Sequence, residues 1–223
     1  DKPKSFIEIK GKRLIDYNLL LLREYRVNEI IIVTGYQCEM FEELAKKSSD
    51  IRLIYNPFYE FVNVLGSFYM GMEALHDDFL YLHADTLCEP AIFEKLLHTP
   101  ADVVLPIDYK KCDEEAMKVR SENGRLVEIT KQMPLNIAEG EFIGIAAFRK
   151  SVILDLKRIV RKLLQEREFA AYFESALQRI LDEKRFDVQS VATDGAFWTE
   201  IDFPDDYNRA ITEIPKCLTE LFG

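Results

Sequence analysis

The sequence predicts a Rossmann-like, doubly wound α/β fold with a mostly parallel mixed sheet and an inserted hairpin lobe. In the first half of the chain, short β-branched or apolar runs alternate with helical patterns at the cadence of βαβ units. The run at 79–85 begins apolar and ends abruptly in His83 and Asp85, which is typical of a strand buried on both faces of a parallel sheet. In the second half, Asn123-Gly124 between two shorter runs indicates a β-hairpin.

The elements are expected in a regular order. After an extended opening segment with a turn at Gly11, leucine and isoleucine recur at mostly helical spacing and predict a helix at 14–25. We then expect strands at 30–33, 51–55, 79–85 and 101–106, with helices at 40–47, 64–75 and 90–97 between them. The remaining expected elements are hairpin strands at 116–119 and 125–129, a strand at 142–148, a helix at 151–166 capped by Ser151, a helix at 173–181, strands at 186–192 and 197–202, and a last helix opened by Pro204. No repeat or flexible linker interrupts the chain, so one domain over residues 1–223 is the simpler interpretation.

Composition limits the function. The 223 residues are 48% hydrophobic, and their formal net charge of −10 argues against non-specific nucleic-acid binding. A nucleotide is compatible with this charge, because a few lysines and a metal ion can hold phosphates. The four cysteines and three histidines show no zinc-site spacing, and scattered thiols suit a reducing, cytoplasmic compartment. No apolar run approaches the roughly 20 residues of a membrane span. No signal peptide is visible, and since the first residue is Asp1 rather than Met, we expect the sequence to begin inside a longer one.

Three acidic residues are candidates for a Mg²⁺ site. Asp85 follows a predicted buried strand, and ligands of open α/β sheets bind outside the carboxyl ends of the strands. Glu200 and Asp202 are two apart in a strand-like run, so their side chains point the same way. The alternative is structural: Asp85 starts a turn, and the other two are an exposed strand edge with a helix-capping Asp.

Three lysines are candidate phosphate partners, because an ammonium is a compact charge suited to phosphate oxygens. Lys4 follows Pro3 in the extended opening segment, Lys118 interrupts an otherwise apolar run, and Lys131 follows the second hairpin strand. The alternative for each of them is an ordinary solvated lysine.

Two further groups have weaker signals. Gly66-Ser67 near the start of a predicted helix allows a close backbone approach to a flat base, although an ordinary helix start would read the same way. An aromatic and acidic pocket for a cationic head group is expected from Tyr172, Phe173, Glu174 and Trp198, with core packing as the alternative for the aromatic rings.

Several motifs together resemble the sugar-phosphate nucleotidyltransferase family. They are KPK at 2–4, IEIKGK at 7–12, IIIVTGY at 30–36, YNPFY at 55–59, the acidic strand end at Asp85, and WTEIDFPD at 198–205. DEEAMKV at 113–119 and GEFIGI at 140–145 resemble its cytidylyltransferase branch, which acts on phosphocholine, inositol-1-phosphate and 2-aminoethylphosphonate. The resemblance spans essentially the whole chain and implies a fold of the nucleotide-diphospho-sugar transferase type.

The resemblance also implies residue roles. Asp85 and Asp202 would hold Mg²⁺ with Glu200 beside them, and Lys4 would contact the nucleotide triphosphate. Thr34, Gly35, Tyr36, Gly66 and Ser67 would line the base pocket, and Lys118 and Lys131 would face the acceptor phosphate. Tyr172 and Glu174 would recognise the acceptor, whereas a sugar acceptor would sit at Glu141.

The sequence departs from this family in two ways. The family begins with a strand and a glycine-rich loop of the form L-A-A-G-x-G-x-R, which would precede Asp1 and is absent from this sequence. The phosphocholine branch often has two consecutive Asn where this chain has Asn63-Val64, and His83 replaces a frequent acidic or small residue. The second difference bears on the identity of the base and the acceptor. Without the glycine-rich loop, a central strand would be missing and the enzyme would be inactive.

The expected reaction is transfer of CMP from CTP to a small phosphate or phosphonate monoester, with release of pyrophosphate. One alternative is a sugar-1-phosphate nucleotidyltransferase that uses UTP, GTP or dTTP, and another is a catalytically silent nucleotide-binding domain. The expected partners are the nucleoside triphosphate and the phospho-acceptor, with neither nucleic acid nor membrane. The sequence is also compatible with a homodimer and with fusion to another enzyme module.

Overall fold

The computed structural model describes residues 2–222, so the first and last residues of the predicted domain lie outside it. The helices are α1 (Leu14–Glu24), α2 (Cys38–Ala45), α3 (Val64–Gly71), α4 (Pro90–His98), α5 (Ile153–Gln165), α6 (Glu174–Glu183), α7 (Pro204–Glu213) and α8 (Lys216–Thr219). The strands are β1 (Glu8–Ile9), β2 (Lys12–Arg13), β3 (Ile30–Thr34), β4 (Ile51–Tyr55), β5 (Phe79–Leu82), β6 (Thr86–Cys88), β7 (Val103–Asp108), β8 (Lys118–Glu122), β9 (Arg125–Thr130), β10 (Gly140–Phe142), β11 (Ile145–Phe148), β12 (Val188–Ala192) and β13 (Trp198–Glu200). No helix of the described range is both long and apolar enough to cross a membrane.

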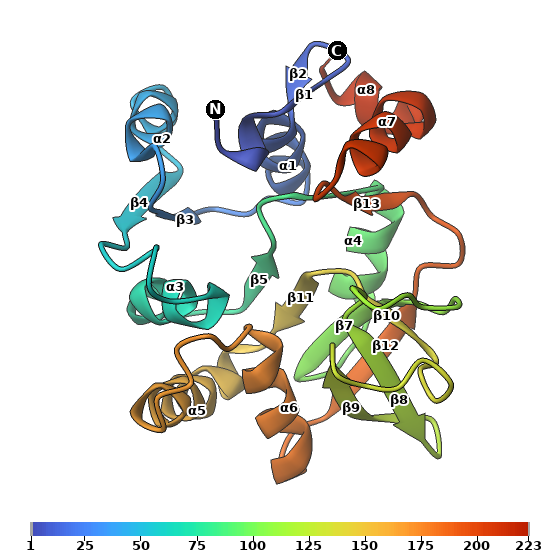
Figure 1. Cartoon of the computed structure of the whole chain (residues 1–223). Coiled ribbons are helices and arrows are strands. Elements are labelled where there is room, and N and C mark those ends of the chain that lie inside the picture. Colours follow the sequence, from blue (N-terminus) through green and yellow to red (C-terminus); the bar gives the residue numbers. More distant parts are fainter. Residues whose placement is uncertain (1, 223) are drawn as a thin grey trace.

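The main sheet has the order β5-β11-β7-β10-β8-β9, with β12 also paired to β7 (Figure 1). The α/β class and the mixed sheet are confirmed, but the pairing is less parallel than expected. Only β3–β4 and β7–β12 are parallel pairs in residues 2–222. Parallel pairing needs a long crossover, whereas β10 and β11 return from the hairpin lobe through short connections and therefore pair antiparallel to β7.

The predicted strand at 142–148 is two strands, because the backbone turns at Gly144. Gly144 has φ +75°, and a Cβ there would lie 2.6 Å from Nδ1 of His83. The amide of His83 donates to the carbonyl of Gly144 at 2.9 Å. Only glycine meets both conditions easily, since it tolerates positive φ and has no side chain to occupy the space of the imidazole.

The local signals in the hairpin lobe were sufficient to predict it. Asn123 and Gly124 have φ values of 52° and 75° and connect β8 to β9 with Glu122 opposite Arg125, as a two-residue hairpin turn requires. Ser151, by contrast, is not the cap of α5. Its hydroxyl donates to Asp102 at 2.8 Å, and a 3₁₀ turn over Lys150–Val152 precedes the helix.

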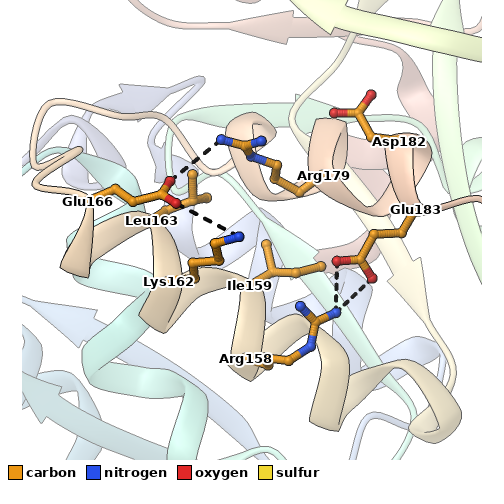
Figure 2. A pocket seen from close by; sticks show the side chains of 8 residues that line it. All are labelled: Arg158, Ile159, Lys162, Leu163, Glu166, Arg179, Asp182 and Glu183. Atoms are coloured by element: carbon orange, nitrogen blue, oxygen red, sulfur yellow. Dashed lines mark hydrogen bonds and ion pairs between the residues drawn. The ribbon is translucent and has the colours of Figure 1, made fainter.

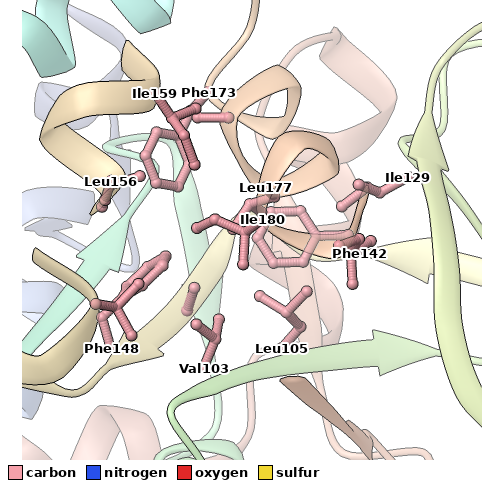
Figure 3. Packing of buried hydrophobic residues seen from close by; sticks show 14 of the residues in the cluster. Val103, Leu105, Ile129, Phe142, Phe148, Leu156, Ile159, Phe173, Leu177 and Ile180 are labelled. Atoms are coloured by element: carbon pink, nitrogen blue, oxygen red, sulfur yellow. The ribbon is translucent and has the colours of Figure 1, made fainter. Parts of the chain in front are cut away.

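The largest core lies between the main sheet and the pair α5 and α6 (Figure 3). Apolar residues recur along one face of α5, and all of them are buried: Ile153, Leu156, Ile159, Val160 and Leu163. Phe173, at the start of α6, is fully buried and stacks on Tyr81 of β5 with ring centroids 3.9 Å apart. Each such buried side chain contributes about 1.5–3 kcal/mol. This core therefore fixes β5, whose carboxyl end leads to Asp85.

The parallel pair β3–β4 stands apart from the main sheet in the described chain (Figure 1). β3 pairs only with β4 and β5 pairs only with β11 among residues 2–222, and residues of both strands line one large cleft. Whether a further strand and a glycine-rich loop complete this sheet stays a prediction.

Candidate active site

The short antiparallel pair β6–β13 brings the two predicted acidic strand ends together. Glu200 lies opposite Thr86, and the amide of Ile201 donates to the carbonyl of Asp85 at 3.0 Å. The side-chain amide of Asn18, from α1, donates to the carbonyl of Thr86 at 3.0 Å and anchors the same turn. Asp85 therefore lies beside the segment that carries Glu200 and Asp202, although 117 residues separate Asp85 from Asp202 in the sequence.

Lys4 joins the two aspartates. Its Nζ lies 3.4 Å from Oδ2 of Asp85 and also donates to Oδ1 of Asp202. Burial alone would lower the pKa of Lys4, but the hydrogen bond and charge of Asp202 and the charge of Asp85 raise it. The ammonium is consequently held in its charged form at the meeting point of the two strand ends. The structure brings Lys4, Asp85 and Asp202 together, and their roles toward a metal ion and a triphosphate stay a prediction.

His83 connects two glutamates on the inner side of this cluster. Nδ1 lies 3.2 Å from Oε1 of Glu200, and Nε2 lies 3.3 Å from Oε1 of Glu174. Burial would lower the pKa of His83, but contacts with both carboxylates raise it to about 10. No role for His83 could be inferred from the sequence, because its partners lie far away in the chain, on β13 and α6.

The pKa values of Asp85 and Glu200 shift in opposite directions. Burial, followed by repulsion from Glu200, raises the pKa of Asp85. Burial also acts to raise the pKa of Glu200, but the hydrogen bond and charge of His83 outweigh it and lower that pKa. One ligand atom from each of His83, Asp85 and Glu200 lies within 4.8 Å of the other two, which fits a single divalent ion. Asp202 is outside this set and pairs with Lys4 instead.

A cleft of about 1200 Å³ extends from this cluster between the two parts of the sheet. Lys4, His83, Asp85, Glu200 and Asp202 line it, together with three of the predicted acceptor-binding residues, Lys131, Tyr172 and Glu174.

The family described as MobA-like NTP transferase domain matches residues 1–180, most of the 223-residue chain. The chain belongs to this family.

Relatives of this NTP transferase domain include cytidylyltransferases. A CTP:phosphoglutamine cytidylyltransferase of Campylobacter jejuni is 24% identical over 228 residues, covering 92% of this chain and 90% of the relative. A choline-phosphate cytidylyltransferase of Haemophilus influenzae is 25% identical over 215 residues, covering 95% and 88%. The resemblance to the cytidylyltransferase branch is thus confirmed.

Solved structures show the same fold. The inositol-1-phosphate CTP transferase from T. maritima superposes with a TM-score of 0.77 at 21% identity, covering 99% of this chain and 88% of that one. The CTP:phosphocholine cytidylyltransferase from Streptococcus pneumoniae gives a TM-score of 0.80 at 22% identity, covering 96% and 91%. The predicted nucleotide-diphospho-sugar transferase type of fold is therefore confirmed for this NTP transferase.

One predicted acceptor contact of the NTP transferase is wrong. Lys118 is 0% exposed, and its Nζ donates to the backbone carbonyls of Glu114 at 2.9 Å, Ala116 at 3.2 Å and Lys131 at 2.7 Å. All three donors of the ammonium are used, so none is left for an acceptor phosphate. Lys118 stood out in the sequence because it interrupts an apolar run, but its side chain turns back onto the backbone and does not reach the cleft.

Lys131 does face the cleft. Its Nζ lies 5.0 Å from the ring centroid of Tyr172 and 3.9 Å from Oε2 of Glu115, which is exposed. Because Lys118 binds the carbonyl of Lys131, it ties the backbone at this position to the segment at 114–116. Lys131 thus lines the cleft, and its contact with an acceptor stays a prediction, whereas Lys118 holds the backbone at this position.

Glu141 lies away from the cleft lining. Its carboxylate pairs with Nζ of Lys110 at 2.9 Å, and the same ammonium lies 4.7 Å from the ring centroid of Trp198. Trp198 in turn donates from its indole nitrogen to Asp108 at 2.9 Å. The ring of Trp198 is thus part of a closed cluster with Lys110, and not of the pocket expected with Tyr172 and Glu174.

Of the five residues predicted to bind the base, the structure places one, Ser67, in the lining of the cleft. Ser67 lines the cleft, and its hydroxyl accepts a hydrogen bond from Asn56 at 3.1 Å. A Cβ at Gly35 would lie 2.5 Å from the Tyr59 side chain, and one at Gly66 would lie 2.5 Å from Val62, so both glycines permit close packing. The four other residues do not line the cleft, and their role in base binding stays a prediction: Thr34, Gly35, Tyr36 and Gly66.

A second, much smaller hollow of about 160 Å³ lies between α5 and α6 (Figure 2). Ion pairs cross it, with Arg158 2.6 Å from Glu183 and Arg179 3.5 Å from Glu166. All of its charged side chains except Asp182 form ion pairs with one another, and Asp182 accepts a hydrogen bond from Gln178, so the hollow is a contact between helices that offers little to a ligand.

Proposed function

We propose that this NTP transferase transfers CMP from CTP to a small phosphate or phosphonate monoester. An oxygen of the acceptor attacks the α-phosphorus of CTP, the bond from that phosphorus to the bridging oxygen breaks, and pyrophosphate leaves. The observation that carries the proposal is the meeting of Lys4, Asp85 and Asp202 at one end of a cleft that also contains Tyr172 and Glu174.

The proposed chemistry depends on positioning and charge. The acceptor oxyanion is already a nucleophile, so the reaction needs no general base. Lys4 is charged and lies beside both aspartates, where it can contact the triphosphate. Asp85, with Glu200 and Asp202 next to it, would hold the divalent ion, Mg²⁺ by the resemblance, which neutralises charge on the phosphates when bound.

A small nitrogen-bearing acceptor is supported by the relatives and by the cleft. The substrates named for two of the relatives are phosphoglutamine and choline phosphate, and a further relative is named for a CMP-(3-aminopropyl)phosphonate, whereas the acceptor named for the structurally similar inositol-1-phosphate CTP transferase has no nitrogen. Each of the first three compounds combines an anionic phosphorus group with nitrogen. Lys131 supplies a cation for the phosphorus group, and the exposed part of the Tyr172 ring lies next to it. Glu141, the expected partner of a sugar, is instead occupied by Lys110, which does not favour a sugar-1-phosphate acceptor.

The test is a substrate matrix. The full chain is incubated with CTP, UTP, GTP or dTTP and with phosphocholine, 2-aminoethylphosphonate, inositol-1-phosphate or glucose-1-phosphate, and pyrophosphate is measured. We expect release with CTP and a nitrogen-bearing acceptor, and its loss in Asp85→Ala but not in Asp205→Asn, which changes an exposed aspartate of α7. Release only with a sugar phosphate would replace this proposal by the sugar alternative. Nucleotide binding without release for any pair would favour the catalytically silent domain.

A further inference from the structure

We propose that His83 is a ligand of the divalent ion, together with Asp85 and Glu200, and that this site therefore binds first-row transition ions such as Mn²⁺ in preference to Mg²⁺. The inference rests on the proposed function only in placing a divalent ion in this cleft. It adds a nitrogen ligand that the family resemblance does not supply.

The three side chains already form a compact ligand set. One ligand atom from each lies within 4.8 Å of the other two. Ligands held about 2.0–2.2 Å from one ion are at most about 4.4 Å apart, so small side-chain shifts of a few tenths of an ångström close the site. Among the three proposed ligands, Lys4 contacts only Asp85, at Oδ2 with a distance of 3.4 Å from its Nζ, so Oδ1 of Asp85 is left for an ion.

Glu174 supplies the second observation. It is only 2% exposed, and neither of its carboxylate oxygens has a hydrogen-bond partner of good geometry in the described chain. Oε1 instead lies 3.3 Å from Nε2 of His83. A carboxylate behind the far nitrogen of an imidazole is the usual orienting partner of a metal-bound histidine. An ion on Nδ1 would draw Nε2–H toward Glu174 and satisfy this buried carboxylate.

The backbone makes room for the imidazole. Nδ1 of His83 occupies the place that a side chain at Gly144 would need, and Gly144 holds the left-handed conformation that this requires. An ion at Nδ1 would displace to solvent the proton that this nitrogen presents to Glu200, while Nε2 would keep its proton on the side of Glu174. Imidazole suits Mn²⁺ to Zn²⁺ better than Mg²⁺, which favours oxygen ligands and retained waters.

The test uses Mn²⁺ on the full chain without nucleotide or acceptor, so its outcome is independent of turnover. Electron spin-echo envelope modulation of bound Mn²⁺ should show coupling to nitrogen, and growth on ¹⁵N-histidine should change that coupling to the ¹⁵N pattern. His83→Gln should remove the coupling and weaken Mn²⁺ binding about 10–100-fold, with less than about a threefold change for Mg²⁺. Glu174→Gln should weaken Mn²⁺ binding about tenfold.

The chain offers matched controls, because its two other histidines, His76 and His98, are exposed. His98→Gln and His76→Gln should leave the nitrogen coupling and both affinities unchanged. Absence of nitrogen coupling in the intact protein, or equal losses for Mn²⁺ and Mg²⁺ in His83→Gln, would overturn the inference. If His83→Gln does not fold, the isotope experiment on the unchanged chain decides alone. Nitrogen coupling without pyrophosphate release from any substrate pair would refute the proposed function and leave the metal site standing.

Discussion

Replacing Gly144 with alanine tests whether close packing against His83 shapes the site. Gly144 and Gly124 both have φ +75°, so alanine carries the same left-handed strain at either position, about 1–2 kcal/mol. At Gly124 a Cβ meets nothing within 4 Å, whereas at Gly144 it meets Nδ1 of His83 at 2.6 Å and Oγ1 of Thr86 at 3.1 Å. Gly124→Ala is therefore a matched control.

The extra cost at Gly144 comes from the displaced imidazole. Forcing additional atoms into a packed region costs about 1–3 kcal/mol. We therefore expect Gly144→Ala to lower the free energy of unfolding by about 2–5 kcal/mol and Gly124→Ala by about 1–2 kcal/mol. Urea unfolding of both variants measures the difference, and Mn²⁺ binding should weaken only in Gly144→Ala. Equal destabilisation by the two substitutions, within about 0.5 kcal/mol, would refute the packing argument.

Three other outcomes are expected. Lys118→Met leaves the buried carbonyl of Ala116 without a hydrogen-bond donor, so it should lower the free energy of unfolding by about 1–3 kcal/mol and raise the KM for the acceptor. The control Lys111→Met, at an exposed lysine, should change neither quantity. A KM for the acceptor equal to that of the unchanged chain would show that Lys118 does not influence the acceptor site. In a Lys131→Met background, Lys118→Met should have no further effect on that KM, and additive effects would show that Lys118 does not act through Lys131. The hydrogen bond from Arg23 lowers the pKa of Asp50, so this pair should add at most about 1 kcal/mol to the free energy of unfolding above pH ~4. This stabilisation should be lost as the pH falls through the lowered pKa, and urea unfolding of Asp50→Asn at several pH values should lack that loss.

Local patterns were enough for most of the fold. The β-branched run that becomes β3, the Asn-Gly turn and the apolar run ending at Asp85 are each contained in a few neighbouring residues. β6 was not predicted because three residues, Thr-Leu-Cys, are too few to show a period. The break at Gly144 was also missed, since its cause is the imidazole of His83, which lies on another strand's end.

The site was predicted in outline and not in its contacts. Asp85, Asp202 and Lys4 could be chosen from residue type and position, and the structure brings them together. The burial of Lys118 and the pairing of Glu141 with Lys110 depend on how long side chains turn in three dimensions, which spacing does not indicate. The same holds for His83, whose two carboxylate partners come from α6 and β13.

The most direct test of the site is the rate of CMP transfer in Asp85→Asn, measured in a single turnover with saturating CTP and acceptor. If Asp85 organises the ion and the phosphates, the rate should fall roughly 100-fold or more while urea unfolding shows an intact fold. A rate equal to that of the unchanged chain would contradict the assignment of this cleft as the catalytic centre.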